Sequence, residues 1–213
     1  MMKENPRSTC MTGDFFISEV TDLESQLSRE WDAGSQLLIE LALQGLDNQE
    51  TLYQAIEHHL RSGGKRIRLL TSLDAGLRLH LEPSERRSLA CACELLHNAS
   101  LVHDDIQDQD PKRRGSSSVW AKYGTDIALL AGDHLLVSAF GAIASSKCSP
   151  LLLSHFQKRT HHLIAGQSKD LSFSHGREDD NPMTLYKTIA SAKSGTLLSL
   201  PLELPLIASG HSN

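Results

Sequence analysis

A group of carboxylates near the middle of the sequence is its feature best suited to chemistry. The order D-D-x-x-D is formed by Asp104, Asp105 and Asp108, at the end of a segment with an apolar helical pattern. On a helix, Asp104 and Asp108 lie four residues apart, so their carboxylates project from one face at neighbouring heights. A solvated acidic turn is the simpler interpretation of D-D-x-x-D alone. Because this acidic end emerges from an apolar helix, we favour a site for Mg²⁺, which prefers one or two carboxylates together with phosphate oxygens.

Basic side chains suited to phosphate occur in two other places. The segment Gly63-Gly64-Lys65-Arg66-Ile67-Arg68 places Lys65 and Arg68 on one face where a helix is predicted to begin, and a helix N-terminus favours anions. Arg113 and Arg114 follow the carboxylates and offer forked donors for phosphate oxygens. A basic loop in contact with solvent, or salt bridges between the acidic and basic groups, is the alternative that these residues leave open.

Length, charge and cysteine content limit the classes of function. The 213 residues suffice for one domain, and the formal net charge of −5 argues against nucleic acid or an anionic membrane as the main partner. Four cysteines are few for this length, so we expect reduced, buried thiols in a cytoplasmic protein. No signal peptide is recognised and no segment of membrane-spanning length is expected, so stable membrane insertion is not predicted. The histidines show no HExxH pattern or zinc-ligand spacing.

The elements that must position these groups are all predicted to be helical, because apolar residues recur at a helical period and no long alternating pattern is present. Helices are predicted over residues 15–46, 51–60, 66–81, 84–108, 125–146 and 150–173, and a last one begins at Asn181-Pro182. A loop is expected from His175 to Asn181, and Pro201 and Pro205 should kink or break a helix. Short loops predict antiparallel packing, so residues 15–213 form a helical bundle after a tail at 1–14.

The order of these groups resembles that of the polyprenyl synthetase family. The run from His97 to Gly115 is similar to the first aspartate-rich region of that family, and Gly63 to Arg68 is similar to its upstream glycine-lysine-arginine motif. Further similar segments are Tyr123-Gly124, Leu130-Ala131-Gly132-Asp133, Gly166-Gln167-Ser168-Lys169-Asp170 and Lys193-Ser194-Gly195. The resemblance extends over roughly residues 20 to 210 and implies an all-α antiparallel bundle of the isoprenoid synthase type.

The resemblance implies a trans-prenyltransferase that condenses isopentenyl diphosphate with an allylic diphosphate by Mg²⁺-dependent ionisation, carbocation attack and proton loss. It implies that Mg²⁺ is held by Asp104 and Asp108 with Asp105 in support, and that the allylic diphosphate is also contacted by Arg113 and Lys193. The residues implied for isopentenyl diphosphate are Gly64, Lys65, Arg68, His97 and Arg114. Those implied for the metal-facing side of the cavity are Gln167 and Asp170.

The sequence also departs from the family pattern. The second aspartate-rich motif is absent before Asn213, so we expect the C-terminal helices of the bundle to be missing, and Asp179-Asp180 does not replace the motif. Leu69 stands where the family usually has proline. The alternatives are therefore an inactive truncated homologue or a non-catalytic partner subunit, whereas a terpene cyclase would not need the isopentenyl residues. We expect a homodimer or association with another synthase subunit. The small Ala99 and Ser100, five and four positions before Asp104, predict that a completed enzyme makes products of geranylgeranyl length or longer. The alternative is that these two residues only permit close helix packing.

Overall fold

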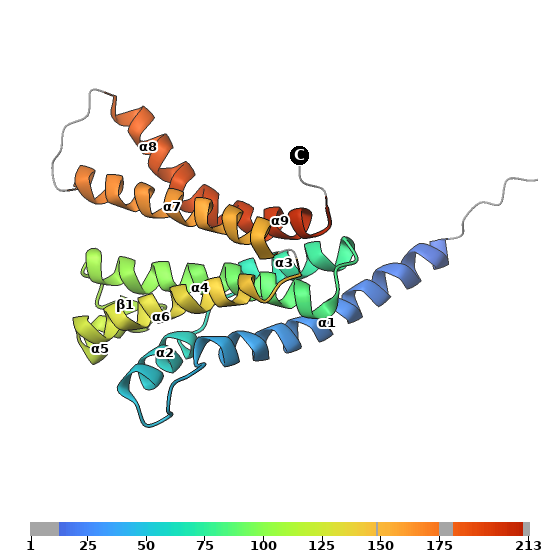
Figure 1. Cartoon of the computed structure of the whole chain (residues 1–213), viewed down its shortest axis with the longest axis horizontal. Helices are drawn as coiled ribbons and strands as arrows, with labels where there is room; N and C mark the ends of the chain where they lie inside the picture. Colours follow the sequence, from blue (N-terminus) through green and yellow to red (C-terminus); the bar gives the residue numbers. More distant parts are fainter. Residues whose placement is uncertain (1–12, 148, 175–180, 211–213) are drawn as a thin grey trace, which may run out of the picture.

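A computed structural model describes residues 13–147, 149–174 and 181–210 of the chain (Figure 1). Among these residues the longer helices are α1 (Gly13–Ala42), α2 (Thr51–Arg61), α3 (Ile67–Arg78), α4 (Pro83–Gln107), α6 (Thr125–Ala144), α7 (Ser149–Ser174), α8 (Pro182–Ala190) and α9 (Thr196–Ala208). Shorter elements are α5 (Val119–Tyr123), a π-helical turn η1 (Ser191–Gly195), and strands β1 (Lys112–Arg113) and β2 (Ser116–Ser117). The predicted all-α bundle is confirmed. The tail and most of the predicted loop at 175–181 lie outside the described residues.

Helix ends follow the local signals in the sequence. Helix α4 begins with Pro83 at its first turn, where a missing N–H costs no intrahelical hydrogen bond. Asn181 caps α8, because its side-chain oxygen accepts a hydrogen bond from the Thr184 amide at 3.2 Å. Helix α2 ends before Gly63, whose φ of +90° is a backbone conformation that glycine adopts readily. The predicted boundaries therefore differ from the observed ones by only a few residues.

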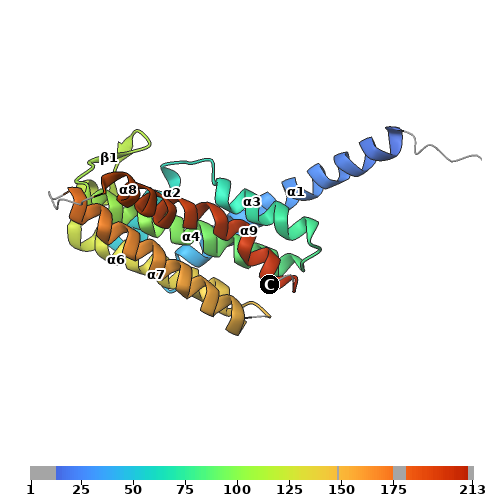
Figure 2. The same ribbon diagram turned by 90° about the horizontal axis from the view of Figure 1, so that it is seen from above.

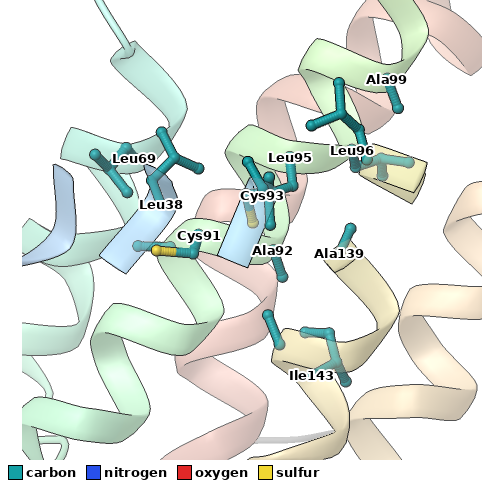
Figure 3. Close-up of a cluster of buried hydrophobic side chains, with 14 of the residues drawn as sticks. Leu38, Leu69, Cys91, Ala92, Cys93, Leu95, Leu96, Ala99, Ala139 and Ile143 are labelled. Atoms are coloured by element: carbon teal, nitrogen blue, oxygen red, sulfur yellow. The ribbon is translucent and has the colours of Figure 1, made fainter. Parts of the chain in front are cut away.

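Helix α4 is the central element, and it contacts α1, α3, α6 and α9 (Figures 1 and 2). Its middle section is buried on every side, and Figure 3 shows Leu38 of α1, Leu69 of α3 and Ile143 of α6 around it. From α4 the cluster includes the large Leu95 and Leu96 and the small Ala92 and Cys93, and the small residues let the neighbouring helices approach closely. The acidic end of α4 is thus fixed by a packed core.

The cysteines in the described residues behave as core side chains. Cys91 and Cys93 are free and buried, as predicted. Burial raises the pKa of the Cys91 thiol to about 12 and raises the pKa of Cys93 as well, so neither is a thiolate at neutral pH. Cys10 and Cys148 lie outside the described residues. Both described thiols are therefore part of the packing and not of the chemistry.

One buried ion pair network joins α1 to α4. Glu30 is 5% exposed, and its carboxylate accepts hydrogen bonds from Arg86 Nη2 at 2.7 Å and from Arg87 Nε at 2.8 Å. Burial alone would raise the pKa of Glu30, but the hydrogen bonds from the two arginines outweigh it and lower the pKa to about 2. The carboxylate therefore stays charged over the working pH range, and α1 remains attached to α4.

Two sequence-based expectations do not hold. Helix α9 continues through Pro201 and Pro205, so the prolines do not break it. Helix α6 has 20 residues and is long and apolar enough to cross a membrane, by length and composition only, although no such segment was expected. A buried core helix passes the same test, and α6 packs along α4 with Ala128, Leu135 and Ile143 buried. We therefore interpret α6 as a core helix.

Candidate active site

Two adjoining cavities lie at the acidic end of α4. The larger has a volume of about 930 Å³ and lies between α4, α6, α7, η1 and α9, with Asp104 and Lys193 at its polar end and Leu163 on its apolar wall. The smaller, of about 440 Å³, is formed by the segment 64–68 and by side chains from α4 and the β-hairpin. Arg68 and His97 line both cavities. The geometry therefore provides two neighbouring binding spaces with a shared wall.

The predicted metal ligands lie on the last turn of α4. Asp104 is half-buried and lines the larger cavity. Asp108 caps the helix one turn later, with its amide donating to the Asp104 carbonyl at 2.8 Å, and is exposed outside the cavity lining. Burial raises the pKa of Asp104, the charge on Lys193 lowers it, and the negative charge on Asp108 raises it again. The net result is a raised pKa for Asp104, so the nearby positive charge does not fully stabilise its ionised carboxylate.

This donor set fits a magnesium ion. The two carboxylates supply hard oxygen donors, and Mg²⁺ takes its remaining oxygens from water and substrate phosphate. Among the described residues, no group of three or more His, Cys, Asp or Glu side chains is placed to hold a metal ion. A cation at Asp104 and Asp108 would therefore take its other oxygens from water and from a bound diphosphate.

Asp105 has a different environment from its neighbour Asp104. It is 1% exposed, and Arg113 Nε donates to its Oδ1 at 2.8 Å, while Arg113 Nη2 contacts the same oxygen. Burial raises the pKa of Asp105 more than the arginine lowers it. Neither residue lines the larger cavity. The structure therefore does not bring Asp105 or Arg113 to the space implied for the allylic diphosphate, and this pair attaches the hairpin to α4.

The hairpin also delivers Arg114 to the smaller cavity. Strands β1 and β2 pair antiparallel, and the two residues between them, Arg114 and Gly115, have φ of +51° and +82°. Such a tight turn suits a two-residue hairpin. Arg114 Nη1 donates to the Gly63 carbonyl, and a Cβ on Gly64 would lie 2.4 Å from that nitrogen. Glycine at position 64 is therefore required for the arginine to occupy this place.

The shared wall carries one fixed positive charge. Arg68 Nε donates to the Leu197 carbonyl at 3.0 Å, and burial lowers the pKa of Arg68 while nearby Glu94 raises it. Burial and the charges on Arg68 and Arg114 lower the pKa of His97 to about 3, so its imidazole is neutral. The His97 Nδ1 atom is buried and has no hydrogen-bond partner among the described residues. Lys65 is exposed and lines the smaller cavity.

A buried hydrogen-bond chain supports this wall from behind. His59 Nε2 lies 3.0 Å from Asn98 Oδ1, and Nδ2 of the Asn98 side chain donates to the Glu94 backbone carbonyl at 2.7 Å. Glu94 Oε2 accepts a hydrogen bond from the Leu69 amide at 3.2 Å. Leu69 is the position at which the family pattern leads one to expect proline, and only a residue other than proline can make this bond. The departure from the pattern therefore gives the buried Glu94 carboxylate a donor.

The α7 side of the larger cavity holds the other predicted residues. Gln167 Nε2 donates to Gln107 Oε1 at 2.8 Å, which links α7 to the end of α4. Asp170 does not line the cavity, but its Oδ2 accepts from Lys193 Nζ at 2.6 Å. Lys193 lies on the π-helical turn, a distortion that is frequent at functional sites. Asp170 thus orients Lys193, and Gln167 holds α7 against the end of α4 at the edge of the cavity.

His103 and Asp133 are residues whose place in the site the sequence reasoning did not assign. Both line the larger cavity, and His103 Nε2 lies 3.4 Å from Asp133 Oδ1. A Cβ on Gly132 would lie 2.2 Å from His103 Nε2, so the glycine makes room for the ring. The sequence could have indicated that both residues belong to the site, because both stand in segments that carry the family resemblance.

Comparison with known proteins identifies the family. The family described as Polyprenyl synthetase matches residues 49–213. The geranylgeranyl pyrophosphate synthase of Geoglobus acetivorans is 33% identical over 165 residues, which cover 76% of this chain and 51% of that protein. The short chain isoprenyl diphosphate synthase of Methanocaldococcus jannaschii is 36% identical over 157 residues, with 72% and 47% covered. The chain thus spans about half the length of these relatives.

Solved structures agree in fold. The geranyltranstransferase of Thermotoga maritima superposes with a TM-score of 0.79 at 30% identity, over 87% of this chain and 69% of that one. The geranylgeranyl pyrophosphate synthetase of Geoglobus acetivorans gives a TM-score of 0.75 at 30% identity, over 85% and 61%. The chain therefore belongs to the polyprenyl synthetase family and has the all-α isoprenoid synthase fold.

Proposed function

We propose that this chain contributes the two substrate cavities of a trans-prenyltransferase of isoprenoid biosynthesis. In this proposal an allylic prenyl diphosphate occupies the larger cavity and isopentenyl diphosphate the smaller. The observation that carries the proposal is the shared wall, because Arg68 and His97 line both cavities and would bring the two substrates into contact. The names of the relatives, which are synthases of prenyl diphosphates, support the reaction class.

The residues around the larger cavity have distinct roles in this proposal. Asp104 and Asp108 would hold Mg²⁺, which when bound stabilises the charge that develops on a departing diphosphate. Lys193 lines the same cavity as Asp104, and although Asp170 accepts one of its hydrogen bonds, its ammonium group has further N–H donors for the diphosphate. Leu163 and Ala99 face the apolar part of the cavity and would bury the prenyl chain. This cavity therefore separates a polar end, where ionisation occurs, from an apolar end.

The smaller cavity would bind isopentenyl diphosphate through charge and fixed donors. Lys65 and Arg114 line it, and Arg68 forms its boundary with the larger cavity. Condensation forms a carbon–carbon bond between the isopentenyl double bond and the allylic carbon, releases diphosphate and then loses one proton. His97 is neutral and has a buried Nδ1 without a partner in the described residues, so it adds no charge repulsion to the carbocation at this boundary.

A non-catalytic partner subunit or an inactive homologue is the second candidate. One relative is named as the large subunit of a heterodimeric geranylgeranyl pyrophosphate synthase. Leu198, Leu202 and Leu206 form an exposed apolar stripe on α9 that suits self-association or contact with another synthase subunit.

We propose the cytoplasm as the location, since the described thiols are free.

Binding and turnover measurements separate the two candidates. We expect calorimetry to show that the chain binds isopentenyl diphosphate, and that it binds a non-hydrolysable thio analogue of geranyl diphosphate only when Mg²⁺ is present. Lys65→Ala should weaken isopentenyl diphosphate more than the allylic analogue, because Lys65 lines only the smaller cavity. Equal weakening of both ligands would refute separate cavities. Binding of both ligands without formation of a longer prenyl diphosphate would favour the non-catalytic candidate.

A further inference from the structure

Arg68 is held at the shared wall by a carbonyl oxygen that a proline leaves available. Its Nε donates to the Leu197 carbonyl of α9 at 3.0 Å. In a regular α-helix this carbonyl accepts a hydrogen bond from the amide four residues later, which here is position 201. Pro201 has no amide hydrogen to donate. Helix α9 therefore lacks the usual donor from four residues later at the oxygen to which Arg68 is attached.

This attachment uses Nε and leaves the other end of the guanidinium available. Within the described residues, neither terminal nitrogen of Arg68 makes a hydrogen bond, and Arg68 lines both cavities. A guanidinium is planar, so a fixed Nε also fixes the directions of its remaining donors. Fixing a long side chain in advance lowers the conformational entropy that a ligand must remove on binding.

We propose that Pro201 is a positioning residue for diphosphate binding, because it reserves the Leu197 carbonyl for Arg68 and so directs the terminal nitrogens of Arg68 at the diphosphate. This inference rests on the proposed function, in which Arg68 binds isopentenyl diphosphate. Pro201 is buried and lines neither cavity, so it acts only through Arg68. This role also gives a reason for the presence of Pro201 inside helix α9.

Pro205 supplies a matched control on the same helix. It is also buried within α9, and its missing amide hydrogen frees the carbonyl of Pro201. No side chain in the described part of the chain donates to that carbonyl, in contrast to the Arg68 contact at Leu197. A change of Pro205 to alanine therefore also replaces a buried proline of α9, but leaves the attachment of Arg68 intact.

The experiment compares wild type, Pro201→Ala and Pro205→Ala. Alanine at position 201 restores an amide that competes with Arg68 for the Leu197 oxygen, so we expect inorganic pyrophosphate to bind about three- to tenfold more weakly by calorimetry. Pro205→Ala should bind like wild type. In nitrogen-15 spectra, the Arg68 Nε–H signal, identified by its loss in Arg68→Lys, should exchange faster with water in Pro201→Ala only. Pro201→Ser restores the same amide and serves if Pro201→Ala does not fold.

The outcomes distinguish this inference from the proposed function. If Arg68→Ala weakens pyrophosphate binding while Pro201→Ala and Pro205→Ala behave alike in both measurements, the positioning role is wrong and the proposed function stands. If Pro201→Ala changes the Arg68 signal but not the affinity, the hydrogen bond joins α3 to α9 without affecting the ligand, and the inference is also wrong. If wild type and Arg68→Ala bind pyrophosphate equally, the proposed role of Arg68 fails and Pro201 has no role in binding.

Discussion

Burial of His59 should make the stability of this fold strongly pH-dependent. The side chain is 3% exposed, and its Nε2 lies 3.0 Å from Asn98 Oδ1, which can only accept, so Nε2 carries the proton of a neutral ring. Burial lowers the pKa of His59 from 6.5 to about 4, and the Asn98 hydrogen bond only partly opposes this change. The folded protein therefore disfavours a proton that the unfolded chain accepts readily.

The sign and size of the effect follow from that difference. Between the folded and unfolded pKa values the unfolded state binds more protons, so the free energy of unfolding falls as pH decreases. The contribution of His59 is almost fully present above its unfolded pKa of 6.5 and is lost progressively as pH falls towards 4. With about 1.4 kcal/mol per pKa unit, His59 accounts for a loss of about 2 kcal/mol between pH 7 and pH 5.

The variant His59→Gln isolates this contribution. Glutamine does not titrate, and its amide can still donate to Asn98 Oδ1. Urea unfolding followed by circular dichroism at pH 7 and pH 5 gives the free energy of unfolding for each protein. The other buried groups titrate in both, so the wild type should lose about 2 kcal/mol more than the variant over this interval. Parallel losses in the two proteins would show that His59 is not buried in its neutral form.

Three further changes test other parts of the structure. Gly64→Ala should weaken pyrophosphate binding more than Gly63→Ala, because both positions have positive φ but only a Cβ at Gly64 meets Arg114; equal effects in calorimetry would implicate the backbone alone. Glu30→Ala leaves two arginines without their shared carboxylate, so urea unfolding should show a loss of about 3–5 kcal/mol, and a loss below about 1 kcal/mol would contradict a buried network. Ala99→Phe should shorten the products of a chimera that adds the C-terminal half of a relative, since Ala99 lines the larger cavity; unchanged product lengths in chromatography would place the cavity floor elsewhere.

The helices could be predicted from the sequence because their signals are local. An apolar period and a helix-starting residue such as Pro83 or Asn181 determine each element without knowledge of its neighbours. The hairpin could not be predicted, since each strand has only two residues and the turn places Arg114, a residue that rarely has positive φ, in a left-handed conformation. Its position depends on the pairing of Arg113 with a buried carboxylate, which is a tertiary contact.

The sequence predicted which residues belong to the site, but not which way their side chains point. The resemblance grouped Asp104 and Asp105, yet adjacent residues on a helix point about 100° apart, so the two side chains can have different surroundings. The structure shows this difference, because Asp105 is enclosed with Arg113 while Asp104 lines the larger cavity. In the same way, Pro201 was expected to disturb its helix, and only the contact between Arg68 and Leu197 shows what replaces the missing hydrogen bond.

The charges around the two cavities indicate that their ligands differ in their need for metal. The smaller cavity is lined by Lys65, Arg68 and Arg114 and by one carboxylate, Glu94, so an anion there meets an excess of positive groups without any cation. At the polar end of the larger cavity, Lys193 is already paired with Asp170, and Asp104 adds a negative charge. A diphosphate placed there would repel the carboxylates unless Mg²⁺ lay between them. Chelation should therefore abolish binding of the allylic analogue and leave most of the affinity for isopentenyl diphosphate, and equal losses for both ligands would mean that the positive groups of the smaller cavity do not suffice.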